Sequence, residues 1–358
     1  MLLFAQFKFN LTRVTEGTNE QYQLTVEPRS KHNISRRQIS EAALKVLYRL
    51  NKAGYRACLV GGGVRDVLLG KHPKDFDVTT SATPEQVNAL FKNCRLIGRR
   101  FRLAHIRYGR EVIEVATFRS HAPESPKTEL NDEGRILRDN TFGSIEEDAL
   151  RRDFTVNALY YDIKDFALLD YANGLQDLQN KTLRLIGDPV TRYKEDPVRM
   201  LRAVRFAAKL EFTIEPAAEQ AIFELGYLLK DIPSARLYDE VLKIFHSGYA
   251  LRSYELLRQY ELFQYLFPKL DKHLKSEPAE AILDFIEQSL VNTDIRISEH
   301  KPVSPAFIFA ALLWPLVHQK AIQLQAEKIS TLPALQIAGS EIFSEQVKTI
   351  AVPKRFSQ

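Results

Sequence analysis

The chain has 358 residues, enough for roughly two or three modest domains that each bury a core. Hydrophobic residues make up 45% and charged residues 27%, which excludes a disordered or a fibrous protein. The net charge of +5 and the pI of about 9.0 hint at a polyanionic partner, although a solvated basic surface gives the same values.

The sequence also carries signals of compartment. Two cysteines, Cys58 and Cys94, without a secretory signal predict reduced thiols in a cytoplasmic protein. The N-terminal MLLFAQFKFN is short and has neither a basic start nor a cleavage site, so it is a poor signal peptide. The longest apolar run, Pro305 to Val317, is too short to span a membrane and predicts a buried helix. We therefore expect no membrane partner.

Residues 1–37 are polar and predict a flexible arm. From 38 to 187 the pattern predicts an α/β head domain, interrupted at 121–140 by a polar, Pro-containing segment typical of a mobile loop. Helices are expected over 40–50, 64–69, 84–91 and 146–158, and strands over 56–60, 76–80, 95–98, 103–108, 112–118, 159–163, 167–171 and 181–186.

After Gly187 the helical period dominates. Helices are expected over 197–210, 215–229, 234–247, 250–260, 278–290 and 305–327. The predicted fold class is therefore α+β, with an α/β head followed by a helical neck at 188–250 and a helical body at 251–358.

A glycine-rich turn is the first candidate site. Leu59-Val-Gly-Gly-Gly-Val-Arg-Asp joins a strand to a helix, and glycines such as Gly62 let backbone N–H groups approach a phosphate. Arg65, in the first helical turn, can reach the same phosphates. A tight turn without a ligand is the alternative. The motif is neither a Walker A loop nor a good dinucleotide fingerprint.

Paired carboxylates follow about a dozen residues later. In Lys74-Asp75-Phe76-Asp77-Val78, strand alternation directs Asp75 and Asp77 to one face. Such neighbours repel unless a cation lies between them, and Mg²⁺ favours these oxygen ligands. Glu114, on a later strand, is a candidate third ligand. The alternatives are an exposed polar edge strand and a solvent-facing glutamate.

Two arginine-rich motifs complete the pattern. Arg151-Arg152-Asp153-Phe154-Thr155-Val156-Asn157 offers an arginine clamp for a triphosphate and an aspartate for ribose or metal. In Glu195-Asp196-Pro197-Val198-Arg199, Asp196 is expected to be the N-cap of a helix, and Asp196 with Arg199 can read a base edge. Charged helices on a solvated surface are the alternative for both.

Together these four motifs resemble the nucleotidyltransferase branch that holds bacterial poly(A) polymerases and CCA-adding enzymes, over about residues 35–325. The segment Leu96-Ile-Gly-Arg-Arg-Phe-Arg-Leu-Ala-His-Ile resembles the bacterial poly(A) polymerases in particular. The resemblance implies a polymerase-β-like head, a nucleotide-recognition neck and an RNA-binding body. It also implies addition of adenylates from ATP to RNA 3′ ends with two Mg²⁺ ions. CCA addition to tRNA and a catalytically silent RNA-binding protein are the alternatives.

The resemblance also implies roles for single residues. Asp75, Asp77 and Asp153 match the family's active-site aspartates, and either Glu114 or Asp153 completes the metal site. Dense arginines predict RNA contacts at Arg99, Arg100 and Arg102. The nucleotide-contacting positions are Gly62, Arg65, Arg152, Asp196, Arg199, Arg202 and Arg205. The family continues into further helices and a basic tail, so we expect the body that ends at Gln358 to be incomplete.

Overall fold

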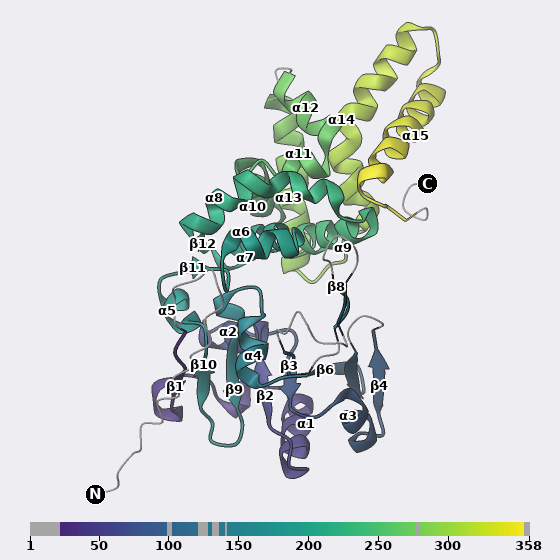
Figure 1. The fold of residues 1–358 in the computed structure, drawn as a ribbon. Helices are drawn as coiled ribbons and strands as arrows, with labels where there is room; N and C mark the ends of the chain where they lie inside the picture. The colour runs from purple at the N-terminus through teal and green to yellow at the C-terminus, as the bar shows by residue number, and fades with distance from the viewer. Residues whose placement is uncertain are drawn as a thin grey trace, which may run out of the picture. The chain divides into compact units, whose positions relative to one another are not determined.

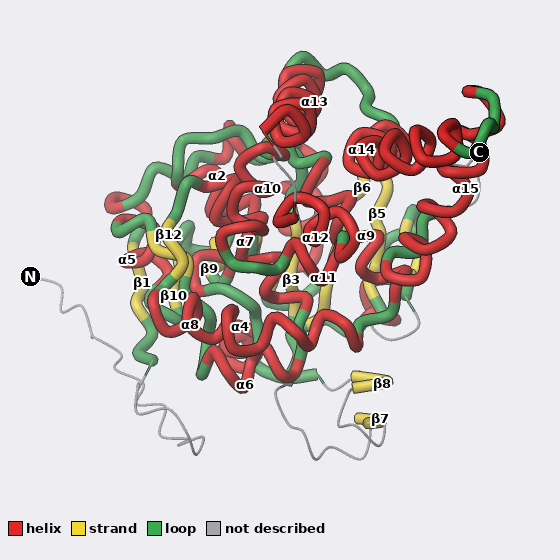
Figure 2. Tube along the Cα trace, turned by 90° about the horizontal axis from the view of Figure 1, so that it is seen from above, coloured by secondary structure: helices red, strands yellow, loops and turns green. Residues whose placement is uncertain are grey.

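A computed structural model describes residues 22–98, 102–120, 128–130, 136–139, 142–276 and 280–353. The chain forms two compact units, Met1–Asp188 and Pro189–Gln358. The first contains a large mixed sheet with helices (Figure 1), and the second is almost entirely helical (Figure 2). The predicted fold class, an α/β head followed by helices, is confirmed.

The sheet of the first unit has eight strands. In spatial order they are β1 (Thr25–Glu27), β10 (Leu168–Asp170), β9 (Leu159–Asp162), β2 (Ala57–Val60), β3 (Asp77–Thr80), β6 (Glu111–Thr117), β5 (Leu103–Tyr108) and β4 (Cys94–Ile97). β3 and β6 pair in parallel, whereas the other neighbours in this sheet are antiparallel. The β3–β6 pair lies near the middle of the sheet, where it carries the candidate site.

The N-terminal segment differs from its prediction as a flexible arm. Residues 1–21 lie outside the described part of the chain. From residue 22 onward the segment is built into the unit, because β1 pairs with β10 at the sheet edge and Ile34 is buried. Leu24 also packs against the core cluster described below. Apolar contacts and edge pairing therefore order a stretch whose composition is mainly polar.

Helices and short strands complete the first unit. They are α1 (Glu41–Lys52), α2 (Gly62–Leu68), α3 (Pro84–Leu90), α4 (Ile145–Leu150), α5 (Gly174–Gln179), β7 (Thr128–Leu130), β8 (Ile136–Asp139) and β11 (Thr182–Leu183), with 3-10 turns η1 (Arg29–Lys31), η2 (Arg36–Gln38) and η3 (Thr155–Asn157). β7 and β8 pair with each other inside the segment predicted as a mobile loop. The rest of that segment lies outside the described residues.

The helix predicted over 146–158 is shorter in the structure. α4 ends at Leu150, and Phe154 then forms an isolated β-bridge with Leu185. The N–H of Thr155 donates to the carbonyl of Arg184 at 3.0 Å, so tertiary pairing competes with continuation of the helix. Arg152 consequently lies in a turn between α4 and this bridge.

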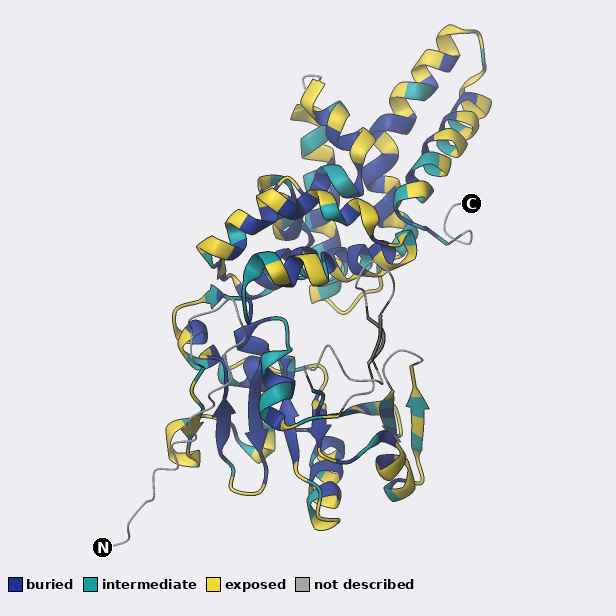
Figure 3. Ribbon diagram, viewed as in Figure 1, coloured by how far each residue is buried: buried dark blue, intermediate teal, exposed yellow. Residues whose placement is uncertain are grey.

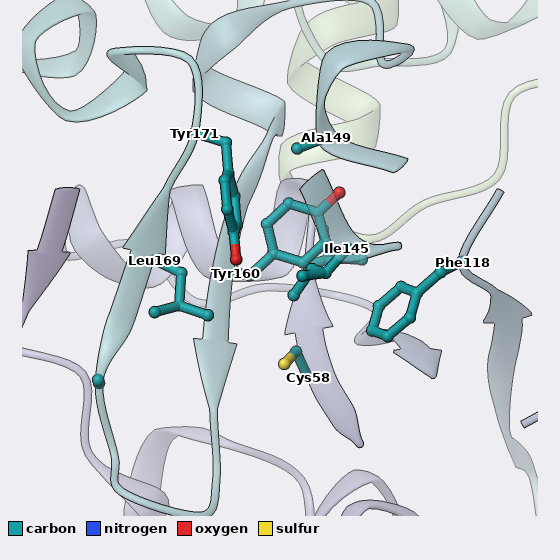
Figure 4. Close-up of a cluster of buried hydrophobic side chains, with 9 residues drawn as sticks. Cys58, Phe118, Ile145, Ala149, Tyr160, Leu169 and Tyr171 are labelled. Atoms are coloured by element: carbon teal, nitrogen blue, oxygen red, sulfur yellow. The ribbon is translucent and has the colours of Figure 1, made fainter. Parts of the chain in front are cut away.

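A buried cluster packs α4 onto the sheet. Ile145 and Ala149 from α4 meet Val60 of β2 and Tyr160 of β9, as Figure 4 shows for three of them. The strands in the middle of the sheet are accordingly buried (Figure 3). The remaining members of the cluster are Cys58, Phe118, Ala167, Leu169 and Tyr171. This packing fixes the face of the sheet on which the candidate site lies.

The second unit is built from helices that vary widely in length. They are α6 (Pro189–Glu195), α7 (Val198–Leu210), α8 (Pro216–Leu225), η4 (Gly226–Asp231), α9 (Ser234–Phe245), α10 (Ala250–Gln259), α11 (Phe263–Leu266), α12 (Pro268–Ser276), α13 (Glu280–Ser298), α14 (Pro305–Ala326) and α15 (Thr331–Thr349), with the short strand β12 (Thr213–Ile214). α7 begins at Val198 with Pro197 as its N-cap, one residue later than predicted. Asp196 instead accepts a hydrogen bond from the Val198 N–H at 3.3 Å.

α14 matches the helix predicted over 305–327 to within one residue and extends beyond the apolar run at 305–317. Its 22 residues reach a mean hydropathy of 1.3 over an 18-residue window, so among the described helices it alone meets the length and composition of a membrane span. However, 56% of that window is buried inside the protein, and α14 packs against α12, α13 and α15. These contacts identify α14 as the core helix of its unit.

A substitution at Gly174 tests the close packing of α5 against η3, which positions the segment that follows α4. A Cβ at Gly174 would collide with the backbone carbonyl of Thr155, which cannot rotate away as a side chain can. We expect Gly174→Ala to lower the free energy of unfolding by about 1–3 kcal/mol. Gly339→Ala in α15 is the matched control, since nothing lies within 4 Å of its Cβ position. Urea denaturation should show the control unchanged or stabilised by up to about 1 kcal/mol; equal effects would contradict the packing argument.

Candidate active site

A glycine turn joins β2 to α2 and lies against the segment before β3. Gly61 has φ 75° and ψ −142°, a conformation that L side chains rarely adopt. A Cβ at Gly63 would lie 3.1 Å from the carbonyl oxygen of Asp75 and 3.1 Å from the Phe76 ring. Glycine at both positions therefore allows the turn to approach the candidate carboxylates closely.

Asp75 and Asp77 lie at the start of β3. Both are exposed while Phe76 and Val78 are buried, so side chains alternate as the sequence predicts, although Asp75 itself precedes the strand. On the neighbouring parallel strand, Glu114 is the register partner of Asp77. Register partners on adjacent strands point to the same face, so these two carboxylates are neighbours.

The surroundings of Asp77 disfavour its ionised form. Loss of hydration, followed by the negative charges of Glu114 and Asp75, raises the pKa of Asp77 to about 6, while the positive charge of Arg152 lowers it. Asp77 still reaches solvent, so a cation can approach it. On the far side of Glu114, His105 of β5 places its Nε2 3.3 Å from the Glu114 Oε1. The site thus concentrates negative charge that a cation would stabilise.

Arg152 borders the same turn. Its Nη1 and the Oδ2 of Asp77 lie 3.8 and 3.7 Å from the point where a Cβ on Gly61 would stand. Its Nε donates to the Tyr160 hydroxyl at 2.9 Å, and its Nη2 donates to Asp148 at 3.0 Å. The guanidinium is therefore held from inside the protein and directed toward the carboxylates.

Arg65 does not reach the surface, contrary to the phosphate contact that the sequence suggests. Its side chain is 1% exposed, and its Nε and Nη2 donate to Asp66 at 2.8 and 2.6 Å. Its Nη1 donates to the Oδ1 of Asn157 at 2.5 Å, and Asn157 in turn donates to the Oδ1 of Asp153 at 3.2 Å. A Cβ on Gly62 would lie 3.4 Å from Nη2 of Arg65. Arg65 thus connects the start of α2 to the Asp153 carboxylate.

In the second unit, Asp196 and Arg199 are each held by a neighbouring charge. The Oδ2 of Asp196 accepts from Nη2 of Arg236 at 2.8 Å. The Nη1 of Arg199 donates to Oε2 of Glu195 at 2.9 Å and to the carbonyl of Arg192 at 2.7 Å. Both groups are partly exposed, with side-chain exposures of 26% for Asp196 and 16% for Arg199. They therefore present ordered polar groups to solvent.

Two further arginines of α7 share one aromatic neighbour. The guanidinium carbons of Arg202 and Arg205 lie 5.4 and 4.5 Å from the centre of the Phe206 ring. Positive groups over an aromatic face are attracted by its electron density. Both arginines are half-buried, so their orientation is restricted by the helix that carries them.

The arginines predicted to contact RNA are described only in part. Arg99 and Arg100 lie outside the described residues. Arg102 is described, and its Nη1 lies 2.8 Å from the Oε1 of Glu85 on α3, with both side chains more than half exposed. An exposed ion pair of this kind contributes little to stability, so Arg102 can exchange Glu85 for another anion.

Sequence reasoning missed four polar residues around the site. Asp148 and Tyr160 contact Arg152, Asn157 contacts Asp153, and His105 contacts Glu114. The four-residue spacing of Asp148 from Arg152 could have indicated that pair. The sequence gives no comparable signal for Tyr160, because an aromatic residue in a strand is ordinarily predicted to pack in the hydrophobic core.

Comparisons with known proteins agree with this geometry. A family model described as the Poly A polymerase head domain matches residues 57–184, and one described as a probable RNA and SrmB-binding site of polymerase A matches residues 211–274. Poly(A) polymerase I of Salmonella typhi is 54% identical over 339 residues, which cover 93% of this chain and 73% of that protein. The chain belongs to the bacterial poly(A) polymerase family.

CCA-adding enzymes are more distant relatives. The enzyme of Lactobacillus helveticus is 38% identical over 220 residues, which cover 62% of this chain and 53% of that protein. The crystal structure of the Bacillus stearothermophilus CCA-adding enzyme in complex with CTP aligns with a TM-score of 0.59 and 30% identity, covering 87% of this chain and 71% of that one. The family resemblance inferred from the four motifs is thereby confirmed.

The raised pKa of Asp77 makes a prediction about stability. The folded-state pKa of about 6 exceeds the ordinary value of 3.8, so ionised Asp77 destabilises the fold. The pKa difference alone corresponds to a larger free energy, but Asp77 is exposed and solvent screens its charge. We therefore expect Asp77→Asn to stabilise the metal-free protein at neutral pH by only about 1 kcal/mol. The gain should be complete above pH 6 and vanish below pH 3.8, where Asp77 is protonated in both states.

Thermal unfolding in EDTA at neutral and at acidic pH measures this effect. Asp239→Asn, at an exposed aspartate of α9, is the control and should leave the melting temperature unchanged. Added Mg²⁺ should shrink the difference, since a bound cation stabilises the ionised carboxylate. A destabilised Asp77→Asn protein in EDTA would contradict the electrostatic interpretation.

Proposed function

We propose that this chain adds adenylates from ATP to RNA 3′ ends without a template and releases pyrophosphate. Membership of the poly(A) polymerase family supports the reaction. The observation that carries it is the parallel pairing that sets Asp77 beside Glu114, next to a glycine turn and a fixed arginine. Cytoplasmic RNA turnover is the setting that we propose for this activity.

Magnesium fits the donor set. Asp75, Asp77 and Glu114 offer carboxylate oxygens, and loss of hydration together with the charges of Glu114 and Asp75 raises the pKa of Asp77, an effect that a bound cation would oppose. Within the described residues no closed cage of three or more His, Cys, Asp or Glu side chains exists. Mg²⁺ usually takes one or two carboxylates together with substrate phosphate oxygens rather than such a cage. We assign Asp75 and Asp77 as ligands and Glu114 as the third carboxylate.

The chain's own residues have separable tasks in this proposal. When bound, two Mg²⁺ ions activate the 3′-hydroxyl and stabilise the leaving pyrophosphate. Arg152 contributes a fixed positive charge to the triphosphate, and the turn that contains Gly62 offers its backbone N–H groups. Asp153 is assigned to the ribose hydroxyls, because Glu114, the register partner of Asp77, is assigned the third metal position.

RNA is the proposed second substrate. The match of residues 211–274 to a probable RNA-binding segment supports contacts by the second unit. We assign Arg202 and Arg205 of α7 to the nucleotide, as the family resemblance implies. Arg102, with Arg99 and Arg100, is assigned to the RNA backbone, which such side chains bind through charge and without regard to sequence.

Nucleotide preference tests the reaction directly. The protein is incubated with Mg²⁺, an oligo(A) primer and each nucleotide separately, and products are resolved by length. We expect a long ladder with ATP and little extension with CTP, GTP or UTP. A parallel reaction uses a tRNA that lacks its terminal CCA. Addition of two cytidylates and one adenylate there, without an ATP ladder, would assign the chain to the CCA-adding reaction.

Base selection is proposed for Asp196 and Arg199. Adenine presents a donor at N6 and an acceptor at N1, which match a carboxylate and a guanidinium respectively. We expect Arg199→Ala to lower kcat/KM for ATP on the order of 10- to 100-fold more than for GTP or UTP, because a wrong base already leaves the polar pair unmatched. Steady-state kinetics with the four nucleotides measure this. An equal decrease for all nucleotides would assign Arg199 to phosphate binding or to structure.

A further inference from the structure

Two buried side chains enclose the guanidinium of Arg152, and the reaction proposed above gives neither of them a task. We propose that Asp148 and Tyr160 are positioning residues that fix Arg152 toward Asp77 and the glycine turn, and so determine the affinity for the nucleotide triphosphate. This inference rests on the proposed function and deepens it, since it concerns how the site holds its substrate.

Three polar groups form a closed set of hydrogen bonds. The Tyr160 hydroxyl donates to the Oδ2 of Asp148 at 2.8 Å and accepts from the Nε of Arg152 at 2.9 Å. The same Oδ2 accepts from Nη2 of Arg152 at 3.0 Å and from its Nε at 3.3 Å. The Oδ1 of Asp148 accepts from the backbone N–H of Arg119 at 3.3 Å, which connects the set to the segment that follows β6.

These contacts fix the direction of the guanidinium. A guanidinium is planar, so holding Nε and Nη2 also fixes the position of Nη1. That third nitrogen lies beside the Cβ-free side of Gly61, where the Asp77 carboxylate also lies. The Arg152 guanidinium carbon lies 5.3 Å from the centre of the Tyr160 ring. Both the ring and the hydroxyl of Tyr160 therefore interact favourably with the positive charge of Arg152.

The sheet brings the three residues together from different elements. Asp148 lies on α4, Arg152 follows the end of that helix, and Tyr160 lies on β9. Val60 on β2 is the register partner of Tyr160 on one side and of Asp77 on the other, so Tyr160 and Asp77 share a face of the sheet two strands apart. Figure 4 shows the Tyr160 hydroxyl directed away from Cys58 and toward the Ala149 end of α4.

Burial makes this set sensitive to small changes. Tyr160 is 0% and Asp148 3% exposed, so water cannot replace a lost partner. Burial raises the pKa of the Tyr160 hydroxyl, which therefore remains a donor at neutral pH. The neighbouring Tyr160 and Asp148 raise the pKa of Arg152 despite its loss of hydration, so the guanidinium stays charged. A preorganised charge binds a triphosphate without the entropy loss of ordering a free arginine.

A role in core stability alone predicts a different outcome from a positioning role. If the hydroxyl of Tyr160 served only the core, its removal would lower the melting temperature and leave ATP kinetics unchanged. If it positions Arg152, its removal weakens binding of ATP in the ground state and in the transition state alike. The second case raises KM for ATP while kcat changes little.

The test compares two tyrosines that are adjacent in β9. Tyr160→Phe removes the hydroxyl that contacts Arg152, whereas Tyr161→Phe removes a buried hydroxyl that makes no hydrogen bond with the described residues. KM for ATP and kcat are measured with an oligo(A) primer and Mg²⁺. We expect KM to rise about five- to tenfold in Tyr160→Phe with kcat within about twofold of wild type, and the Tyr161→Phe control to match wild type.

A double-mutant cycle shows whether the effect passes through Arg152. Arg152→Lys is made alone and together with Tyr160→Phe, and Asp148→Asn is treated in the same way. We expect each second substitution to change KM by less than about twofold in the Arg152→Lys background, because residues that act through one group are not additive. An unchanged KM in folded Tyr160→Phe protein, or a full effect in the Arg152→Lys background, overturns the proposal.

Equilibrium binding of ATP to the same proteins separates this inference from the function on which it rests. If wild-type protein fails to extend RNA with ATP, the proposed function fails, and ATP affinity still tests the positioning of Arg152. If extension occurs but Tyr160→Phe and Tyr161→Phe bind ATP equally well, the positioning role fails while the proposed function stands.

Discussion

Parallel pairing of β3 with β6 is the constraint on which the first unit depends. Backbone hydrogen bonds set the register, so Asp77 and Glu114 cannot be separated without breaking the sheet. Two carboxylates in this position repel, and loss of hydration adds to the cost of ionising Asp77. Arg152 offsets part of that cost, and the adjacent glycine turn presents no Cβ to block the approach of a ligand. The arrangement is costly in isolation and suited to binding a cation and a polyanion together.

Arg65 and Arg152 show that the hydrogen-bond partners of an arginine determine whether it supports the fold or can contact a substrate. Arg65 is enclosed by Asp66 and Asn157, where its charge is neutralised within the protein. Arg152 is held by Asp148 and Tyr160, and its Nη1 borders the glycine turn. Both lie in motifs that resemble phosphate-binding segments, and residue type alone does not distinguish them. A buried, fully engaged guanidinium supports the fold, whereas one with an edge at the site can contact a substrate.

The sequence predicted the sheet better than it predicted the contacts around the site. A continuous apolar run for β2, and the strand patterns for β3, β5 and β6, place these strands within a residue of their observed bounds. α4 was overpredicted, because the pairing of 154 with 185 is a long-range contact that local periodicity does not contain. The short helices α5, α6, α11 and α12 were missed, since tertiary packing rather than periodicity stabilises short helices. The longer α15 was missed as well, because Pro333 and Gly339 within it have low helix propensity. Tyr160 illustrates the same limit at the site, because its hydroxyl meets Asp148 and Arg152 only when α4 packs on β9.

Asp196 and Arg199 show how ion pairs can prepare a polar site for selection. Asp196 accepts from Arg236 and from the Val198 N–H, and an ionised carboxylate with about four lone-pair sites keeps capacity for a further donor. Arg199 is fixed through its Nη1 by Glu195 and a backbone carbonyl, and its planarity then fixes the remaining nitrogens. Groups held in this way cannot rotate to suit a base with the opposite pattern of donors and acceptors. In the proposed base-reading role, discrimination would depend as much on the ion pairs behind Asp196 and Arg199 as on these two groups themselves.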